Sequence, residues 1–341
     1  MIPVIDMHCD TISAIAKDYP NRSLRQNNGH LDLLRMKQGG YMCQCFALYT
    51  NLDDVKKRGE TPFKHACMLS DVFDAEMKKN ADLILPVTTG SQIEQNARRG
   101  LMSALKTVEE GAVYEGDLKK LQFFYDKGVR KSTLTWNFKN ELAYPNPSEY
   151  DPSIDEMAAV HIDVEHGLTP VGFEFVCAME SMGMLIDISH LNDAGIRDIF
   201  SVVKPDTPIV ASHSNARGVC FHPRNLSDEM IRQLASHGGV CGINYMSTFL
   251  DENARVVKDH AKRKSRISDM IRHMKYIRNI GGIDVIGLGS DFDGIGGDLE
   301  IRGAQDMQKL ADALSVSGFT TDEIEKVLYK NALRVYKQVL S

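Results

Sequence analysis

Short apolar segments alternate with longer amphipathic segments along the whole chain. Several of the short segments are nearly continuous apolar runs, such as LIDI at 185–188 and VIGL at 285–288. Such runs are typical of strands in a parallel sheet that is covered on both faces. The pattern predicts eight strands, at residues 2–8, 41–49, 101–109, 129–136, 184–190, 208–213, 239–245 and 285–291.

The segments between these strands have the spacing of amphipathic helices. Apolar residues recur close to every 3.6 positions over residues 63–79. Thr169 followed by Pro170 predicts a helix that runs to Met182, because Thr caps a helix and Pro fits its first position. The TTDE sequence that starts at Thr320 is a capping box, and it predicts a terminal helix that ends near Val339.

Eight strands that alternate with helices predict an α/β fold, a closed TIM-type (β/α)8 barrel that forms a single domain over residues 1–341. A doubly wound open sheet is the alternative. Its dinucleotide-binding form is disfavoured, because no GxGxxG motif follows the first strand. The PNP sequence at 145–147 marks a loop within residues 142–152.

Composition narrows the class of protein. The 341 residues are 43% hydrophobic and 25% charged, which is ordinary for a soluble enzyme, and the net charge of −6 gives no basic surface for a nucleic acid. The seven cysteines are an odd number and mostly lie in apolar segments, so a disulfide scaffold is not expected. No leader-like start and no apolar run of about 18 residues is present, so we expect a cytoplasmic protein with no membrane partner.

Polar residues gather where the predicted strands end. His8 and Asp10 follow the first apolar run, and residues i and i+2 of a strand point to the same side. Imidazole and carboxylate are ligands that zinc accepts. Four later strands end in the same kinds of residue, namely Glu109, His190, His213 and Asp291. Barrel enzymes build their active sites at this end of the strands, so the six side chains are expected on one rim.

Three His, two Asp and one Glu are enough ligands for two metal ions if Glu109 bridges them. A bridging carboxylate holds two cations about 3.5–4 Å apart, which is the spacing of cocatalytic metal sites. Such a pair lowers the pKa of a shared water to near neutrality and supplies a hydroxide nucleophile at about pH 7.

The motifs VIDMHCDT, TVEEG, LIDISH, PIVASHSNARGVC, HPRN and GLGSDFDG together resemble the membrane (renal) dipeptidase family, including its soluble bacterial members. They occur in consistent order between about Val4 and Val339. The resemblance implies a (β/α)8 barrel with two Zn²⁺ ions that hydrolyses dipeptides. It implies His8, Asp10 and Glu109 as ligands of one zinc ion, and Glu109, His190 and His213 as ligands of the other. Glu110 is the competing candidate for the Glu position.

The resemblance also implies roles in substrate binding and proton transfer. Arg224 in HPRN would clamp the substrate carboxylate, and a planar guanidinium suits this role because it binds a carboxylate through two hydrogen bonds. Asp291 would be the acid/base residue that moves the proton to the leaving amine. Trp136 stands where mammalian-type members have a His that supports the substrate carbonyl, so Trp136 is expected to form a wall for the substrate side chain. The carbonyl would then rely on zinc or on Asn137, Asn140 or Tyr245.

Two other functions stay open at this stage. One is a different barrel hydrolase of amides or esters, such as a deacylase, lactonase, phosphotriesterase or β-lactam hydrolase. Those relatives usually carry His-x-His on the first strand and a carboxylated Lys on the fourth, whereas this chain has His8-x-Asp10 and no such Lys. The other is a catalytically inactive barrel, but every matched ligand position holds a metal-competent residue. The expected partner is a dipeptide substrate, and a homodimer is compatible because relatives are often dimers.

Overall fold

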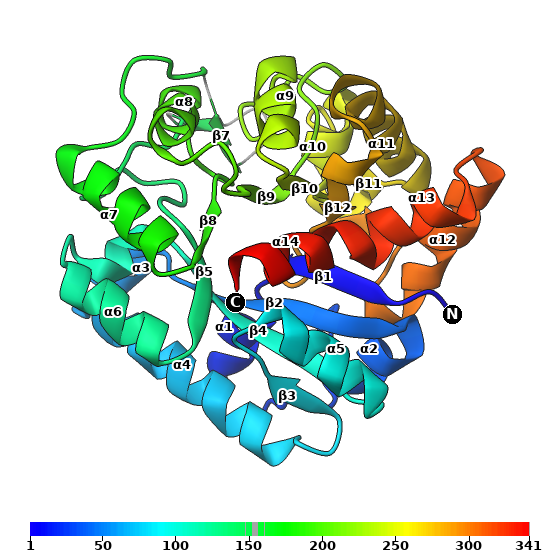
Figure 1. The fold of residues 1–341 in the computed structure, drawn as a ribbon, viewed down its shortest axis with the longest axis horizontal. Coiled ribbons are helices and arrows are strands. Elements are labelled where there is room, and N and C mark those ends of the chain that lie inside the picture. The colour runs from blue at the N-terminus through cyan, green and yellow to red at the C-terminus, as the bar shows by residue number, and fades with distance from the viewer. Residues whose placement is uncertain (147, 152–155, 160, 341) are drawn as a thin grey trace.

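The computed structural model describes residues 1–146, 148–151, 156–159 and 161–340. Parallel strands form a closed barrel surrounded by helices (Figure 1), which confirms the predicted α/β barrel. Pairing of Asp6 with Leu288 joins the first and last strands and closes the ring. In order around the barrel, the eight strands are β1 (Val4–Cys9), β2 (Tyr41–Tyr49), β4 (Met102–Glu109), β5 (Val129–Thr133), β8 (Leu185–Asp187), β9 (Val210–Ser214), β10 (Val240–Ile243) and β12 (Ile286–Leu288).

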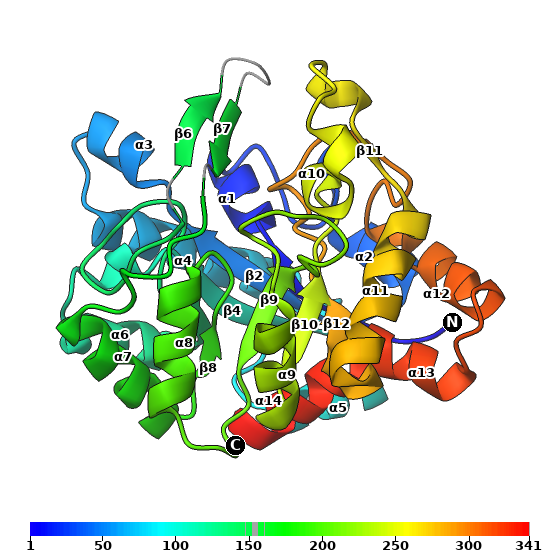
Figure 2. The same ribbon diagram turned by 90° about the horizontal axis from the view of Figure 1, so that it is seen from above.

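Three further pieces of sheet lie outside this ring. β3 (Ile84–Pro86) pairs with the start of β4, and its three residues are too few to show a periodic pattern in the sequence. β11 (Lys264–Ser265) pairs with β13 (Asp298–Leu299). β6 (Ser148–Asp151) and β7 (Glu156–Ala159) form an antiparallel pair that projects beyond the carboxyl ends of the strands (Figure 2).

The segment from 142 to 152 therefore corrects the prediction of a loop, because part of it is strand β6. Pro147 and Pro152 lie outside the described residues. The capping predictions hold, since the side chains of Thr169 and Thr320 accept hydrogen bonds from the first turns of their helices. The predicted terminal helix differs in one respect, because a π-helical turn (Lys326–Lys330) separates its two parts.

The α-helices are α1 (Thr11–Ala16), α2 (Leu33–Gly39), α3 (Leu52–Lys57), α4 (Pro62–Lys79), α5 (Gly90–Arg98), α6 (Leu118–Asp126), α7 (Pro170–Ser181), α8 (Asp193–Val202), α9 (Asp228–Ser236), α10 (Ser247–Leu250), α11 (Ile267–Gly281), α12 (Met307–Val316), α13 (Thr321–Glu325) and α14 (Asn331–Val339). Short 3₁₀ turns occur at Gly111–Tyr114, Glu252–Ala254, His260–Lys262, Ile283–Val285 and Ala304–Asp306. No described helix is long and apolar enough to cross a membrane.

Helix α14 closes the amino-terminal end of the barrel (Figure 2). Its Leu333 and Tyr336 pack against Ile5, Cys43 and Cys45 of the barrel interior. The Tyr336 hydroxyl lies 3.1 Å from the Cys45 sulfur, and all seven cysteines are free, as expected. Since one end of the barrel is filled by this helix, a substrate site is left to the carboxyl end.

A buried ion pair lies inside the barrel, below the carboxyl end. Lys131 Nζ donates to Asp187 Oδ2 at 2.9 Å and to the Met7 carbonyl at 3.0 Å. Asp187 Oδ1 accepts the backbone N–H groups of Ser189 and Ser212, so this carboxylate ties the ends of β8 and β9 together. Burial opposes ionisation of Asp187, but the charge of Lys131, together with an electrostatic contribution from His213 and the hydrogen bonds from Ser212, outweighs it and holds the Asp187 pKa well below its usual range.

We expect Lys131→Met to lower the free energy of unfolding by about 3–5 kcal/mol, because it leaves a buried carboxylate without its cation. Urea unfolding at neutral pH measures the loss, with Lys78→Met on the exposed face of α4 as the control that changes stability by less than about 0.5 kcal/mol. The depressed pKa of Asp187 contributes stability above about pH 4, and this contribution is lost as the pH falls further. Equal losses in the two variants would contradict the prediction.

Candidate metal centre

The structure brings six of the predicted residues together at the carboxyl end of the barrel. They form three overlapping sets whose ligand atoms lie within 4.8 Å of one another. The sets are His8, Asp10 and Glu109; Glu109, His190 and His213; and His8, His213 and Asp291. Glu109 belongs to two of the sets, and so do His8 and His213, so the cluster can hold more than one cation.

Two of these residues, each shortly after a strand, have a positive φ angle that orients their side chains toward the cluster. His190 follows β8 with φ of 71°, and Asp291 follows β12 with φ of 62°, values that few residues other than Gly adopt. Such strain is typical of functional sites, where the surrounding structure maintains it. At Gly294 a Cβ atom would lie 2.2 Å from Asp10 Oδ2 and 2.6 Å from Asp291 Oδ1, so only glycine allows the chain to pass this close to the two carboxylates.

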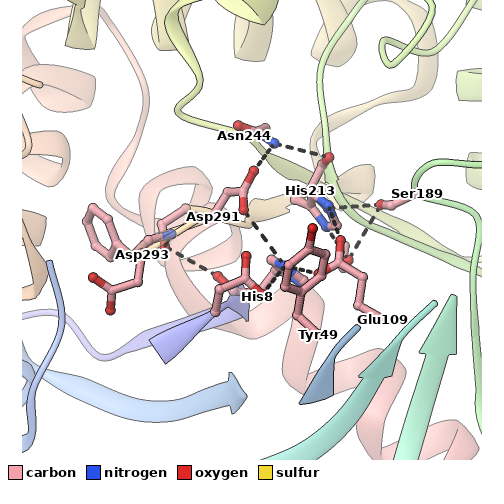
Figure 3. A network of polar contacts seen from close by, with 12 residues as sticks. His8, Tyr49, Glu109, Ser189, His213, Asn244, Asp291 and Asp293 are labelled. Carbon is pink, nitrogen blue, oxygen red and sulfur yellow. Dashed lines mark hydrogen bonds and ion pairs between the residues drawn. The ribbon is translucent and has the colours of Figure 1, made fainter. Parts of the chain in front are cut away.

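Glu109 lies at the centre of the cluster. Its Oε2 is 3.1 Å from His8 Nε2, while its Oε1 is 3.0 Å from His190 Nε2 and 3.5 Å from His213 Nε2. Figure 3 shows His8, His213 and Asp291 gathered around this carboxylate. The two oxygens of Glu109 thus face different histidines, which is the arrangement a bridging carboxylate needs.

The polar atoms of the cluster fit a divalent cation. His8 Nε2, Asp10 Oδ1 and Glu109 Oε2 are buried, and none of them makes a hydrogen bond of acceptable geometry with a described residue. His190 Nε2 and His213 Nε2 lie only 3.0 Å apart. Two imidazole nitrogens at this distance need a proton or a cation between them, and a mixed set of imidazole and carboxylate ligands suits zinc.

Both histidines of this close pair are held through their other ring nitrogen. His190 Nδ1 lies 3.0 Å from Asn137 Oδ1, and His213 Nδ1 lies 2.8 Å from the Ser212 hydroxyl. With Nδ1–H donating to Asn137, the Nε2 lone pair of His190 points toward Glu109. Contacts of this kind fix the tautomer of metal-binding histidines.

Burial makes the acidic groups of the cluster unfavourable when they are ionised close together. It raises the pKa of Asp10 to about 7, with the charge of Glu109 adding to the effect, and raises the pKa of Asp291 to about 6. Burial, with the charge of Arg224, lowers the pKa of His190 to about 4, so His190 is neutral at physiological pH. Burial likewise keeps the pKa of His213 well below its usual range, so three crowded carboxylates beside the neutral imidazoles of His190 and His213 would gain from a bound cation.

A cavity of about 320 Å³ opens above the cluster. Its described lining residues include Asp10, Glu109, His190 and Asp291, together with Ser13, Ala14, Lys17, Tyr49, Trp136, Asn137, Arg224, Met246, Phe249, Asp293, Gly294 and Ile295. Trp136 and Tyr49 form an aromatic wall, with their rings 5.1 Å apart in an edge-to-face arrangement. The cavity volume lies at the small end of the range for ligand pockets.

Arg224 brings a partly buried positive charge to the same cavity. Its Nη2 donates to the His213 carbonyl at 3.2 Å, while its Nε is buried without a hydrogen-bond partner among the described residues. Burial lowers the pKa of Arg224 to about 10, so the guanidinium is still charged at neutral pH. A cation with a buried, unused N–H group favours a bound anion.

One candidate from the sequence lies elsewhere than expected, and one residue of the site was not predicted. Tyr245 was expected to contact substrate, but it is fully buried in the core with its hydroxyl 3.7 Å from the Met307 sulfur, and it is not among the described residues that line the cavity. The preceding residue, Asn244, points toward the site and donates to Asp291 Oδ2 at 3.0 Å (Figure 3). Asn244 was missed, although a buried polar residue directly after an apolar strand is the signal that identified the other site residues.

The fold and this cluster define a barrel metallohydrolase, and comparisons with known proteins agree. The family model for membrane dipeptidase (peptidase family M19) matches residues 1–341. A dipeptidase from Claviceps purpurea, tcpJ, is 26% identical over 323 residues, covering 91% of this chain and 69% of that protein. An uncharacterized protein encoded in the pqqA 5' region of Klebsiella pneumoniae is 31% identical over 251 residues, covering 74% of this chain and 87% of that protein.

Solved structures agree on the fold. A metallopeptidase from Rhodobacter sphaeroides, crystallised with a phosphinate mimic of the dipeptide L-Ala-D-Ala, has a TM-score of 0.85 at 24% identity, with 99% of both chains covered. A probable dipeptidase from Pseudomonas aeruginosa, PvdM, has a TM-score of 0.79 at 16% identity, with 99% of this chain and 96% of that chain covered. The chain belongs to the membrane dipeptidase family, which confirms the resemblance seen in the sequence.

Proposed function

We propose that the protein is a dipeptidase that works with two zinc ions, one held by His8, Asp10 and Glu109 and the other by Glu109, His190 and His213. The observation that carries the proposal is the buried Glu109 carboxylate, which faces three imidazole nitrogens within 3.5 Å. When bound, two zinc ions polarise a scissile carbonyl and supply a hydroxide nucleophile near neutral pH.

Asp291 is the residue we assign to proton transfer. Its Oδ1 lies 3.8 Å from His8 Nε2, and its Oδ2 accepts the hydrogen bond from Asn244 that fixes the carboxylate. Burial raises the pKa of Asp291 to about 6, which suits a group that takes a proton and then gives it to the leaving amine near neutral pH.

Arg224 selects the substrate in this proposal. The guanidinium and the metal ligands line one small cavity, so a free carboxylate bound by Arg224 lies close to the bond that is cleaved. This arrangement suits dipeptides and disfavours longer peptides, whose carboxylate is farther from the first peptide bond. The mimic of L-Ala-D-Ala bound by the relative from Rhodobacter sphaeroides supports extending the substrates to dipeptides with a D residue at the second position.

We expect Arg224→Met to raise KM for dipeptides about 100-fold, because removing one partner of a desolvated, hydrogen-bonded charge pair costs about 2–5 kcal/mol. Steady-state kinetics with a dipeptide and its C-terminal amide measure the effect. The unmodified enzyme prefers the free carboxylate strongly, and the variant loses that preference. Arg224→Lys serves as the matched control, because it keeps the charge without the two-pronged geometry and is expected to fall between the other two proteins. An unchanged KM would contradict the assignment.

A substrate panel tests the function as a whole. Zinc-loaded protein is incubated with L-Ala-L-Ala, L-Ala-D-Ala, N-acetyl-L-alanine and a simple lactone, and released products are quantified. We expect cleavage of one or both dipeptides at rates well above those of the other two compounds. Cleavage of the N-acyl amino acid or the lactone alone would indicate a deacylase or lactonase instead.

A further inference from the structure

The loop that follows β5 reaches the metal centre with two neighbouring side chains. Trp136 places its ring 6.1 Å from the ring of His190 and 5.1 Å from that of Tyr49. Asn137 places its Oδ1 3.0 Å from His190 Nδ1. The position of one short loop therefore decides both the aromatic wall of the cavity and the partner of a candidate metal ligand.

Glu110 holds this loop from inside the protein. Its side chain is fully buried, and its Oε2 accepts the backbone N–H of Trp136 at 3.0 Å. Its Oε1 accepts hydrogen bonds from the Ala112 backbone and from the Asn140 amide. No described cation lies within ion-pair distance of Glu110, so these three N–H groups are what stabilises the buried carboxylate.

Asn140 links both ends of this loop to the Glu110 carboxylate. Its amide nitrogen also donates to the Leu134 carbonyl at 2.7 Å, and its Oδ1 accepts the backbone N–H groups of Leu142 and Ala143. The loop is therefore closed by side-chain hydrogen bonds at both ends, and Glu110 is the group they share.

The backbone around Glu110 is adapted to this task. Glu110 has φ of 91°, a strained value for a residue with a side chain, and its backbone N–H donates to the Thr133 hydroxyl at 3.0 Å. A Cβ atom at Gly111 would lie 2.5 Å from the Leu134 carbonyl oxygen, so the loop packs directly on this turn. As a result Glu109 faces the histidines while Glu110 faces the loop.

We propose that Asn137 and Glu110 are positioning residues of the metal centre: Asn137 fixes the tautomer and orientation of His190, and Glu110 fixes the loop that presents Asn137. The inference rests on the proposed two-metal function and deepens it. In this role both residues act through His190. The second glutamate of the EEG sequence, which competes with Glu109 as a ligand candidate in the sequence, thereby gains a separate part in building the same site.

Metal binding tests the inference without relying on activity. Purified protein is stripped of metal and titrated with Co²⁺ alone, following the visible absorption of each binding step. We expect Asn137→Leu, which is similar in size but has no acceptor, to weaken the step that involves His190 about 10–100-fold and to leave the other step unchanged. Asn137→Asp keeps an acceptor oxygen and is expected to restore binding to within a few-fold of the original protein.

Glu110→Gln is titrated in parallel, with Glu174→Gln on the exposed face of α7 as its matched control. We expect Glu110→Gln to weaken the step that involves His190 about tenfold, because one acceptor oxygen of the side chain is replaced by an NH₂ group that faces other donors. The control is expected to bind Co²⁺ like the unmodified protein. If Asn137→Leu fails to fold by circular dichroism, Asn137→Ser takes its place, since it shortens the side chain without adding an apolar group.

The outcomes separate the two proposals. Unmodified protein that binds no Co²⁺ would overturn the proposed two-metal function. Unmodified protein that binds two ions, with unchanged affinity at both steps in the Asn137 variants, would overturn the positioning role and leave the proposed function intact. Weakening of both steps to the same degree would likewise contradict a role that acts through His190.

Discussion

Replacing Glu109 with Gln is expected to lower kcat/KM for dipeptide hydrolysis by at least about 10⁴-fold, the scale seen when a central member of a catalytic unit is removed. Glutamine has nearly the same shape, so the barrel is retained, but it brings an amide N–H toward imidazoles and loses the charge shared by both proposed metal sets. Bound zinc is expected to fall together with activity. Kinetics and metal analysis of the same preparation measure both effects.

The control for this prediction is Glu174→Gln, which makes the same chemical change on an exposed surface. It is expected to retain both zinc and activity. A Glu109→Gln enzyme that binds zinc normally and turns over at the original rate would show that this carboxylate is not part of the metal centre.

Replacing Asp291 with Asn is expected to lower kcat about 10²–10⁴-fold, because an amide cannot accept and return a proton. Zinc content is expected to change little, since each proposed metal set is complete without Asp291. Kinetics with metal analysis separate this role from ligation, which is a real alternative because Asp291 also lies within reach of His8 and His213. Loss of zinc along with activity would assign Asp291 to the ligands.

The same variant should alter the pH profile. Burial raises the pKa of Asp291 to about 6. Bound cations would lower this pKa, so above about pH 6 the carboxylate is ionised and ready to accept a proton. The activity of the unmodified enzyme is therefore expected to fall on the acid side of this value. The residual activity of Asp291→Asn should lack that particular decline.

The barrel could be predicted from the sequence because its strands are buried on both faces. Their continuous apolar runs, separated by amphipathic helices, are compatible with few folds other than a parallel α/β fold. β3 could not be predicted, since three residues carry no period. The end of β5 was also placed too late, because the expected strand reached Trp136 whereas the observed one stops at Thr133. The intervening residues belong to the loop that Glu110 holds.

The sequence could predict which end of the barrel each site residue occupies, because strand direction alone decides this. Residues directly after parallel strands share one end of the barrel, and this rule brought the six metal-centre candidates together. The same rule does not show which of two consecutive residues faces the site, because the side chains of consecutive residues point in opposite directions. Asn244 faces Asp291, so Tyr245 points outward into the core beside α12. The contact between Asn137 and His190 depends on a loop conformation that no periodic pattern encodes.

The most direct test of the whole account is metal analysis of the unmodified protein beside His190→Ala. The account predicts about two zinc ions per chain in the unmodified protein, falling to about one in the variant, because His190 contributes to only one of the two ligand sets that share Glu109. An unchanged zinc content in the variant, or an unmodified protein that binds no zinc, would contradict it.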